Sequence, residues 1–283
     1  MNRVGWLILL FPMLAGCSGV DVLNSLVPHC GYTLTADLAY GGLPRQKLDV
    51  YRPKKPAEGA PVVIFFYGGH WQYGSKSDYF FVAQALASRG FVAVLPDYQL
   101  YPQVTFPTFV QDGASSVRWV HENIGRFGGD PGKIYLMGHS AGAYIVAMLT
   151  LDGHYLKDVG LDQHAIRGTA GLSGPYDFVP LPEDKAVFGM SETDATPDPA
   201  IEPIHFVDGH APPLLLLHGL KDQTVDSGNS SRLEAKIRSA GGKVQYIAYP
   251  ARAHVGVVLA LAWPFRWLDP VLDDTVKFFN EHS

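Results

Sequence analysis

The chain has 283 residues, of which 47% are hydrophobic and 17% are charged, and its formal net charge is −5. This length and this hydrophobic content predict one folded domain with a large core and exclude an extended disordered protein. The small negative charge, without any run of Lys or Arg, excludes nucleic acid as an expected partner.

The N-terminal residues have the pattern of a secretion signal. Arg3 gives a basic start, and the apolar stretch after it is too short to span a bilayer stably. Small residues lead to Cys17, and the pattern resembles a bacterial lipoprotein signal, in which the peptide is cleaved before a cysteine that carries the lipid. We expect a signal peptide over residues 1–16 and lipid anchoring through Cys17 at a membrane surface. An ordinary signal peptide and an uncleaved anchor are the alternatives.

This reading places the protein in a bacterial cell envelope, on the periplasmic face of a membrane, with the outer membrane favoured over the inner one. Lipidation of Cys17 leaves Cys30 without an intramolecular partner, so no disulfide is expected. If cleavage occurs elsewhere, a bridge between Cys17 and Cys30 is the alternative. Residues 17–44 are interpreted as a lipidated tether and a lead-in that contains a first edge element.

Apolar runs and helical spacing then alternate along the chain. Strands are predicted at residues 47–53, 61–69, 91–98, 134–137, 166–174, 213–219 and 244–250. Helices are predicted at residues 78–90, 109–128, 141–148, 230–241 and 269–282. Such alternation indicates an α/β fold with a mostly parallel central sheet and helices on both faces.

Residues 178–210 do not fit this alternation, because five prolines exclude a long helix there. We interpret the segment as an insertion over the carboxyl edge of the sheet that acts as a lid or as a binding wall. A surface loop without a role in binding is the alternative.

The chain changes from strand to helix across a single serine, Ser140. Gly138 and Gly142 stand two positions on either side of it, where side chains would prevent close packing of the strand and the helix. This Gly-x-Ser-x-Gly pattern in a sharp turn predicts Ser140 as an exposed nucleophile. A helix-capping serine is the alternative, but it leaves the two glycines unexplained.

A nucleophilic serine needs a base, and the base needs an acid that orients it. In this topology the order along the chain is serine, acid, histidine. Only His254 and His282 follow the candidate acids, and His282 is the penultimate residue, so His254 is predicted as the base. Asp222 is predicted as the acid because it directly follows a buried strand. Asp226 better suits a helix cap, and Asp177 suits a turn or the pocket.

Acyl transfer also needs amide donors for an oxyanion. The backbone amides of Gly68 and Gly69, together with that of Ala141 after the nucleophile, are predicted to form this oxyanion hole. Glycines suit the position because no Cβ keeps the backbone away from the substrate. A tight turn without such a role is the alternative for the two glycines.

These motifs occur in order along the chain and together resemble the α/β-hydrolases of the carboxylesterase branch. The resemblance is strongest to hormone-sensitive-lipase-like esterases and kynurenine-formamidase-like hydrolases, and it is carried by residues 67–71, 97–102, 123–143, 218–225 and 253–256. It covers residues 45–283 and implies that they form an α/β-hydrolase catalytic domain. It also implies a triad of Ser140, Asp222 and His254, with no metal and no organic cofactor.

The chain departs from these families in the glycine loop, where Tyr67 stands at the position usually held by histidine and a histidine follows as His70. A tyrosine hydroxyl can also donate a hydrogen bond that fixes the loop. Trp71 matches the families and is predicted to form a wall of the substrate pocket. Tyr144 and Phe178 are further candidates for the pocket, with a place in the core as the alternative.

Together these features predict a serine hydrolase that cleaves small carboxylic esters through an acyl-enzyme on Ser140. An amide or formamide hydrolase with the same triad is the first alternative. A non-catalytic envelope lipoprotein that keeps the fold for binding is the second alternative, from another class of function. The sequence leaves the acyl chain length and the oligomeric state open.

Overall fold

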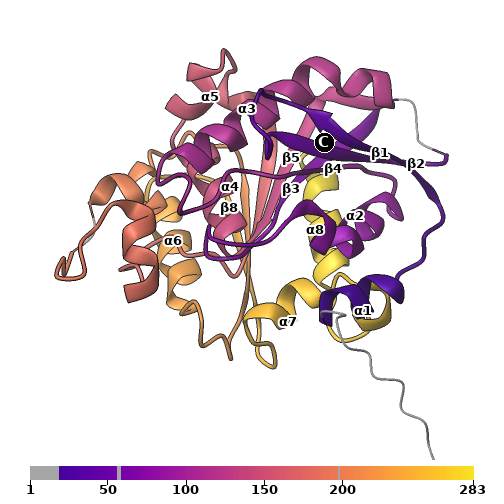
Figure 1. The fold of residues 1–283 in the computed structure, drawn as a ribbon. Coiled ribbons are helices and arrows are strands. Elements are labelled where there is room, and N and C mark those ends of the chain that lie inside the picture. The colour runs from indigo at the N-terminus through magenta and orange to yellow at the C-terminus, as the bar shows by residue number, and fades with distance from the viewer. Residues whose placement is uncertain (1–18, 56–58, 197) are drawn as a thin grey trace, which may run out of the picture.

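The computed structural model describes residues 19–55, 59–196 and 198–283. The predicted signal peptide and Cys17 lie outside these residues. An eight-stranded sheet with the order β1-β2-β4-β3-β5-β6-β7-β8 forms the centre of the described chain (Figure 1). The strands are β1 (Tyr32–Ala39), β2 (Lys47–Pro53), β3 (Ala60–Phe66), β4 (Val92–Pro96), β5 (Gly129–His139), β6 (Ile166–Leu172), β7 (Leu214–Gly219) and β8 (Val244–Tyr249).

The sheet is mostly parallel, as the alternation of strands and helices predicted. β2 pairs antiparallel with β1 and with β4, and every pair from β4 to β8 is parallel. At its centre, Ile64 of β3 lies opposite Val94 of β4 and Leu136 of β5, and all three are fully buried. β1 is the edge element expected in the lead-in, so the sheet already begins within residues 17–44.

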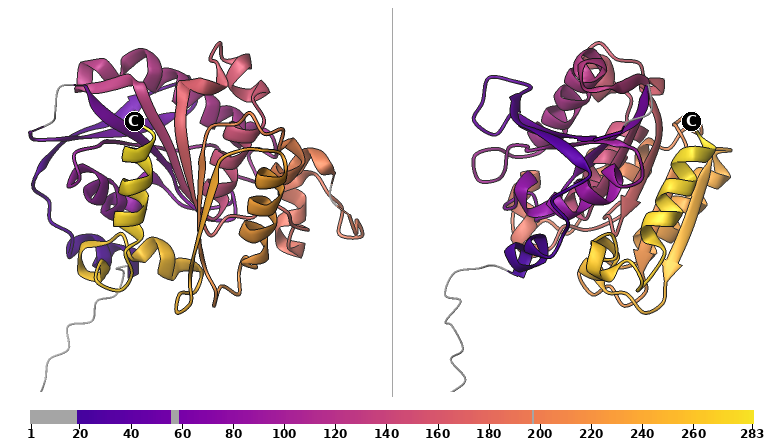
Figure 2. Two further views of the ribbon diagram at one scale, coloured as in Figure 1. Left: turned by 180° about the vertical axis from the view of Figure 1, so that it is seen from behind. Right: turned by 90° about the vertical axis from the view of Figure 1, so that its right-hand side faces the viewer.

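Helices cover both faces of the sheet (Figure 2). α3, α4 and α6 pack on one face, and α2 and α8 pack on the other. The helices are α1 (Gly19–Ser25), α2 (Phe80–Ala87), α3 (Thr108–Asn123), α4 (Ala141–Leu151), α5 (His154–Asp158), α6 (Gly228–Ser239), α7 (His254–Leu259) and α8 (Val271–Glu281). Within the described part of the chain, none of these helices is long and apolar enough to cross a bilayer.

Two local predictions need correction. The helix predicted over residues 109–128 ends at Asn123, and a 3-10 turn over Ile124–Phe127 follows and closes on Gly128, whose φ is +79°. A glycine adopts this left-handed conformation without a Cβ penalty, and so it ends the helical segment there. The short helices α1, α5 and α7 have too few residues to show a helical period and were not predicted, and α1 lies in the segment interpreted as a tether.

In the insertion over residues 178–210, the described residues, which leave out residue 197, form no long helix, as the prolines predicted. Three short 3-10 helices form instead, η4 (Pro182–Phe188), η5 (Pro199–Ile201) and η6 (Pro203–Phe206), and each begins at a proline. The segment packs on the domain, because the amide of Phe106 donates to the carbonyl of Val187 at 2.8 Å and the Tyr144 hydroxyl donates to the carbonyl of Ile201 at 2.8 Å.

Candidate active site

Ser140 lies in the turn between β5 and α4, at the carboxyl end of the parallel strands. Its φ of +54° and ψ of −119° are strained for a residue with a side chain. A Cβ on Gly138 would lie 2.3 Å from the carbonyl oxygen of Gly142, and a Cβ on Gly142 would lie 2.0 Å from that of Phe66. Both glycines are therefore required for this turn, for the packing reason that the sequence pattern indicated.

The structure brings Ser140, His254 and Asp222 together, although they lie on separate elements. His254 is the first residue of α7, and its Nε2 lies 2.9 Å from Oγ of Ser140. Its Nδ1 lies 2.7 Å from Oδ2 of Asp222. The carboxylate can only accept, so Nδ1 carries the proton and Nε2 is free to accept from the Ser140 hydroxyl. This is the arrangement that a serine nucleophile and its base require.

The Asp222 carboxylate is fully buried and accepts several hydrogen bonds. Its Oδ1 accepts from the amides of Thr224 and Val225, each at 2.9 Å, and its Oδ2 faces His254 and His218. Burial alone would raise the pKa of Asp222, but hydrogen bonds from His218, from His254 and from the Val225 amide outweigh it and hold the pKa well below its ordinary value. Asp222 is therefore ionised throughout the physiological pH range.

The two other candidate acids lie elsewhere. Asp226 is largely exposed and accepts from the amide of Gly228 at the start of α6, as expected of a residue that caps a helix. Asp177 forms an ion pair with Arg232 and lines a cleft beside Trp71. Among the described residues, neither Asp226 nor Asp177 forms a hydrogen bond or an ion pair with His254.

His218 is a residue of the site that the sequence reasoning missed. It is fully buried at the end of β7, and its Nε2 lies 3.2 Å from Oδ2 of Asp222 and 3.0 Å from the carbonyl oxygen of Val225. Because both neighbours are acceptors, Nε2 carries the proton, and Nδ1 accepts from the Ser230 hydroxyl at 2.7 Å. The signal was the spacing of four residues between His218 and Asp222 at the end of a buried strand.

His139, directly before the nucleophile, is a second histidine that was missed. Its ring centroid lies 4.9 Å from that of His254, and its Nε2 lies 3.3 Å from the carbonyl oxygen of His254. Burial, with the neighbouring His254 as a smaller cause, lowers the pKa of His139 to about 3. The ring is therefore neutral at ordinary pH and places no positive charge beside the base.

The glycine loop after β3 has an unusual backbone. Gly69, His70 and Trp71 have φ values of +135°, +52° and +57° in succession. A Cβ on Gly69 would lie 2.1 Å from the carbonyl oxygen of Tyr73, so only glycine fits there. The amide of Gly68, one of the three predicted for the oxyanion hole, also faces the Tyr79 hydroxyl, where it lowers the pKa of Tyr79 against the larger effect of burial.

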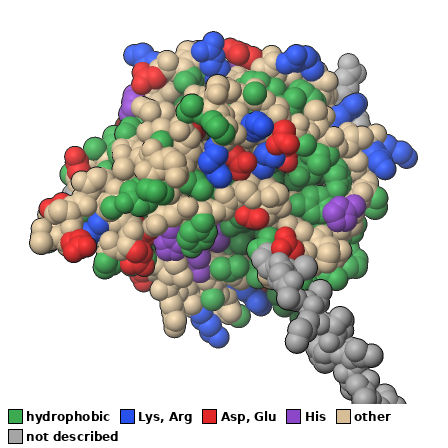
Figure 3. Space-filling model, viewed as in Figure 1, with side chains coloured by type: hydrophobic (Ala, Val, Ile, Leu, Met, Phe, Trp, Pro, Cys, Tyr) green, Lys and Arg blue, Asp and Glu red, His purple; other side chains and the backbone are tan. Residues whose placement is uncertain are grey.

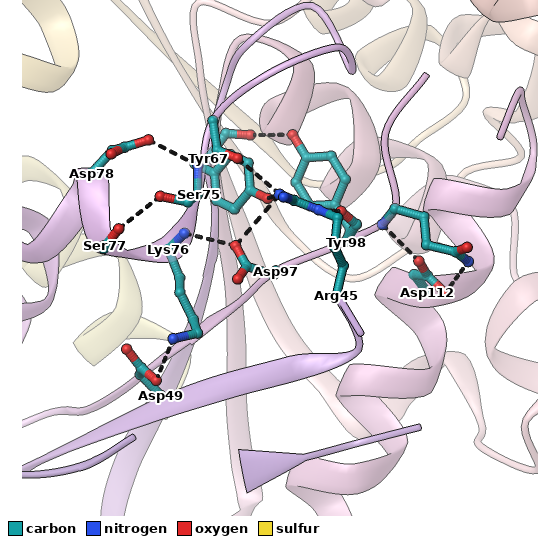
Figure 4. Close-up of polar contacts among 12 residues, drawn as sticks. Arg45, Asp49, Tyr67, Ser75, Lys76, Ser77, Asp78, Asp97, Tyr98 and Asp112 are labelled. Carbon is teal, nitrogen blue, oxygen red and sulfur yellow. Dashed lines mark hydrogen bonds and ion pairs between the residues drawn. The ribbon is translucent and has the colours of Figure 1, made fainter. Parts of the chain in front are cut away.

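Tyr67, the departure from the family pattern, is held by several hydrogen bonds (Figure 4). Nη2 of Arg45 donates to the Tyr67 hydroxyl at 2.6 Å and to the carbonyl of Gly74 at 2.8 Å. The hydroxyl of Tyr98 donates to the Tyr67 carbonyl at 2.8 Å, and the two rings stack with centroids 4.6 Å apart. The larger ring is thus accommodated, and Arg45 links both ends of the glycine loop.

His70 connects the glycine loop to the insertion. Its Nδ1 lies 3.0 Å from Oδ2 of Asp184, which is buried in η4 and also accepts from Gln72 at 3.0 Å. The hydrogen bond to Asp184 raises the pKa of His70, although partial burial opposes this shift. The contact between His70 and Asp184 therefore ties two segments that are more than 100 residues apart.

A cleft of about 390 Å³, which we call the Trp71 cleft, lies between the glycine loop, the insertion and the turn after Asp222. Trp71 and Phe178, two of the pocket candidates, line this cleft with their rings inclined by 20°. Tyr144 does not line it. That side chain is fully buried behind Trp71, with the two rings edge to face at 5.2 Å, because α4 points it into the core under the insertion. Of the two alternatives for Tyr144, a place in the core and a place in the substrate pocket, the structure shows the core.

Among the described residues, no group of three or more His, Cys, Asp and Glu side chains is placed to hold a metal ion. Ser140, Asp222 and His254 form the principal polar cluster at the carboxyl edge of the sheet. The cluster supplies a hydroxyl, an imidazole and a carboxylate, and the glycine loop supplies backbone amides. These are the groups that acyl transfer uses.

Comparison with known proteins agrees with this geometry. A probable isoprenylcysteine alpha-carbonyl methylesterase from Oryza sativa subsp. japonica is 31% identical over 238 residues, which are 78% of this chain and 58% of that protein. Esterase LipQ from Mycobacterium tuberculosis is 30% identical over 268 residues, which are 87% of this chain and 63% of that protein. The chain thus spans about six tenths of the length of these relatives.

A solved structure, that of esterase B from Lactobacillus rhamnosis inhibited by a tributyrin phosphonate, has the same fold. Its TM-score is 0.79 with 22% sequence identity, and the match covers 93% of this chain and 90% of that one. This confirms the α/β-hydrolase fold that the motifs predicted. The BD-FAE family model matches residues 48–237, which is more than half of the chain. The chain therefore belongs to the BD-FAE family of α/β-hydrolases.

Proposed function

We propose that this protein is a serine hydrolase that cleaves carboxylic esters. The observation that carries the proposal is the continuous hydrogen-bonded series from Ser140 through His254 to Asp222. The names of the two relatives, both esterases, support ester hydrolysis as the reaction. The fold and the strained turn at Ser140 support it as well, because they place the hydroxyl at the carboxyl end of the parallel strands. Ser140 is only 8% exposed there, so it is more enclosed than the sequence pattern predicted.

In the first half of the reaction, Oγ of Ser140 attacks the ester carbonyl while Nε2 of His254 takes the hydroxyl proton. The carbon–oxygen bond to the alcohol then breaks, and His254 returns the proton to the departing oxygen. In the second half, water attacks the acyl-enzyme with His254 again as the base, and the acid leaves. Asp222 keeps His254 in the required tautomer and stabilises its charged form throughout.

The oxyanion that forms during each attack needs amide donors. In this proposal the amides of Gly69 and Ala141 are the principal donors. Ala141 follows the nucleophile as the first residue of α4, where the helix dipole favours negative charge. The amide of Gly68, which the sequence also predicted, is the third donor in this proposal.

The variant Ser140→Ala tests the nucleophile. It is expected to lower kcat for p-nitrophenyl acetate by about a millionfold and to abolish labelling by a fluorophosphonate probe. Ser116→Ala, which changes a buried serine of α3 away from the site, is the matched control and should keep both activities. Hydrolysis by folded Ser140→Ala at a substantial fraction of the wild-type rate would disprove the assignment.

The same three side chains also suit amide or formamide hydrolysis, which was the first alternative from the sequence. A panel of p-nitrophenyl esters measured beside N-formylkynurenine distinguishes the two reactions. Ester hydrolysis with kcat/KM at least tenfold higher supports the proposal, and the reverse ratio supports the alternative. A folded protein that cleaves neither and does not react with the fluorophosphonate supports the non-catalytic role.

We also propose that the protein is attached to an envelope membrane through a lipid on Cys17. The support is the pattern of residues 1–17, which lie outside the described structure. Several acyl chains on one cysteine would hold the protein at the membrane surface. The variant Cys17→Ser should move the protein from the membrane fraction to the soluble fraction, and its continued recovery with the membranes would refute the attachment.

A further inference from the structure

A second cleft, of about 260 Å³, lies on the opposite side of the glycine loop from the Trp71 cleft. We call it the α1 cleft, because the N-terminal helix α1 forms one of its walls. The residues that define it are Val20 and Leu23 of α1, Val255 and Val258 of α7, and Gly69 and His254 of the site. Figure 3 shows histidine and hydrophobic side chains side by side on the lower part of this face.

The two clefts differ in chemistry. The Trp71 cleft is lined by three carboxylates, Asp177, Asp184 and Asp226, and by Arg232, whereas His70 lines both clefts. The lining of the α1 cleft is mostly aliphatic and aromatic, and Asp78 is the one carboxylate that the described residues contribute to it. An uncharged apolar group therefore fits the α1 cleft better than it fits the Trp71 cleft.

The wall formed by α1 is fixed to the rest of the domain. Nδ2 of Asn24 donates to the carbonyls of Ser77 and Asp78 at 3.1 and 3.2 Å, and its Oδ1 accepts from the amide of Phe81 at 3.3 Å. Leu23 is 7% exposed, whereas Val22 on the same helix is 46% exposed. The helix therefore turns one apolar face to the cleft and another to solvent.

The position of His254 decides which part of an ester the α1 cleft receives. His254 lines this cleft and is absent from the lining of the Trp71 cleft. In ester cleavage the proton that His254 takes from Ser140 goes to the alcohol oxygen as the bond between that oxygen and the acyl carbon breaks. The alcohol must therefore leave on the side of the histidine.

We propose that the α1 cleft binds the alcohol part of the substrate ester and selects uncharged alkyl groups, with Val20 and Leu23 as specificity-determining residues. The inference rests on the proposed ester hydrolysis and adds the substrate class. It also gives α1, which precedes the hydrolase domain proper, a direct part in substrate recognition.

The test compares two series of esters by pH-stat titration. One series holds the acid constant, as alkyl acetates from methyl to hexyl, and the other holds the alcohol constant, as methyl esters from acetate to hexanoate. The variant Val20→Trp narrows the cleft and should lower kcat/KM for hexyl acetate at least tenfold relative to methyl acetate. The methyl ester series should keep its wild-type dependence on chain length.

Leu23→Ala widens the cleft and gives a second measurement that does not depend on a bulky replacement. It should raise the ratio of kcat/KM for hexyl acetate to that for methyl acetate above the wild-type ratio. Val22→Trp is the matched control, since Val22 lies on the solvent face of the same helix and does not line the cleft. It should leave both series unchanged.

The outcomes separate this inference from the proposed function. If wild-type protein cleaves none of the esters, the proposed function fails. If wild-type protein is active but Val20→Trp and Leu23→Ala change the methyl ester series instead of the acetate series, the α1 cleft is an acyl site and the inference is overturned. If neither folded variant changes either series, the cleft does not bind substrate.

Discussion

The Asp222 carboxylate interacts with two histidines in different ways. His254 must turn its Nδ1 toward Asp222 and its Nε2 toward Ser140, whereas His218 is fixed by Ser230 and by the carbonyl of Val225. His218 therefore has no freedom to act as a base. It is a positioning residue that holds the carboxylate and keeps it ionised.

Replacing His218 tests this role. His218→Phe removes a hydrogen bond to a charged group, which contributes about 1.5–3 kcal/mol, so kcat/KM is expected to fall about ten- to a hundredfold. The acid limb of the pH profile for kcat/KM should also move to higher pH, because an Asp222 carboxylate without the hydrogen bond from His218 stabilises the charged form of His254 more strongly. His218→Gln keeps a donor and should recover part of the activity. A profile that keeps its shape in His218→Phe would contradict the role.

Tyr67 fixes the glycine loop through its hydroxyl, which accepts from Arg45. Tyr67→Phe keeps the ring stacked on Tyr98 but leaves Nη2 of Arg45 without this acceptor. We expect kcat to fall about tenfold while KM changes little, since the loop amides act mainly on the oxyanion in the transition state. The kinetic constants for p-nitrophenyl acetate check this, with Tyr40→Phe as a control on a neighbouring buried hydroxyl that bonds to Asp97. Unchanged kcat in Tyr67→Phe would show that stacking alone holds the loop.

At the scale of elements, the site depends on contacts between segments that the sheet does not join directly. The insertion contacts the glycine loop through Asp184 and His70, and it covers Tyr144 through the carbonyl of Ile201. The buried Asp184 of η4 is the main polar link in this contact. The insertion is thus a wall of the Trp71 cleft that is packed in place, which supports the binding-wall interpretation of residues 178–210.

The link between His70 and Asp184 predicts a dependence on pH. Asp184 raises the pKa of His70, so the contact stabilises the fold fully below the ordinary histidine pKa of about 6.5, and this stabilisation is lost as pH rises through the raised value. The melting temperature of wild type should exceed that of Asp184→Asn most at acidic pH, and the difference should shrink at alkaline pH. Glu192→Gln, which changes an exposed carboxylate of the same insertion that does not act on His70, is the control. A difference that stays constant with pH would contradict the link.

At the scale of the whole molecule, a histidine that stays neutral inside the fold makes the free energy of unfolding depend on pH in the acidic range. The pKa of His139 is lowered to about 3, whereas an unfolded histidine has a pKa of about 6.5. Below pH 6.5 the unfolded chain therefore binds a proton that the folded protein does not. Stability is complete above this pH and is lost progressively as pH falls toward 3.

Urea unfolding at a series of pH values checks this expectation. Between pH 6 and 4 the free energy of unfolding should fall with a contribution from His139 of up to about 1.4 kcal/mol per pH unit. His139→Gln, which keeps a donor for the carbonyl of His254, should show a shallower slope. Parallel slopes for the two proteins would show that His139 is charged in the folded state.

The sequence predicted the elements that depend on local patterns. The strands β3 to β7 contain short apolar runs, which the sequence shows directly. The turn at Ser140 is marked by two glycines, at which an added Cβ would clash with the backbone. The predictions failed or were silent where length or context decides. α1, α5 and α7 are too short to show a period, and α3 ends at Asn123, before the 3-10 turn that Gly128 closes. Tyr144 was assigned equally to pocket and core, and it lies in the core.

By itself the sequence determined the order of strands and helices, the nucleophile turn and the set of residues from which a base and an acid could come, because each of these depends on neighbours along the chain. Only the tertiary structure decided that Asp222 lies beside two histidines and that α1 closes a cleft beside His254. The physical reason is that these contacts join segments far apart in the chain, and their distances are set by how the sheet and its helices pack.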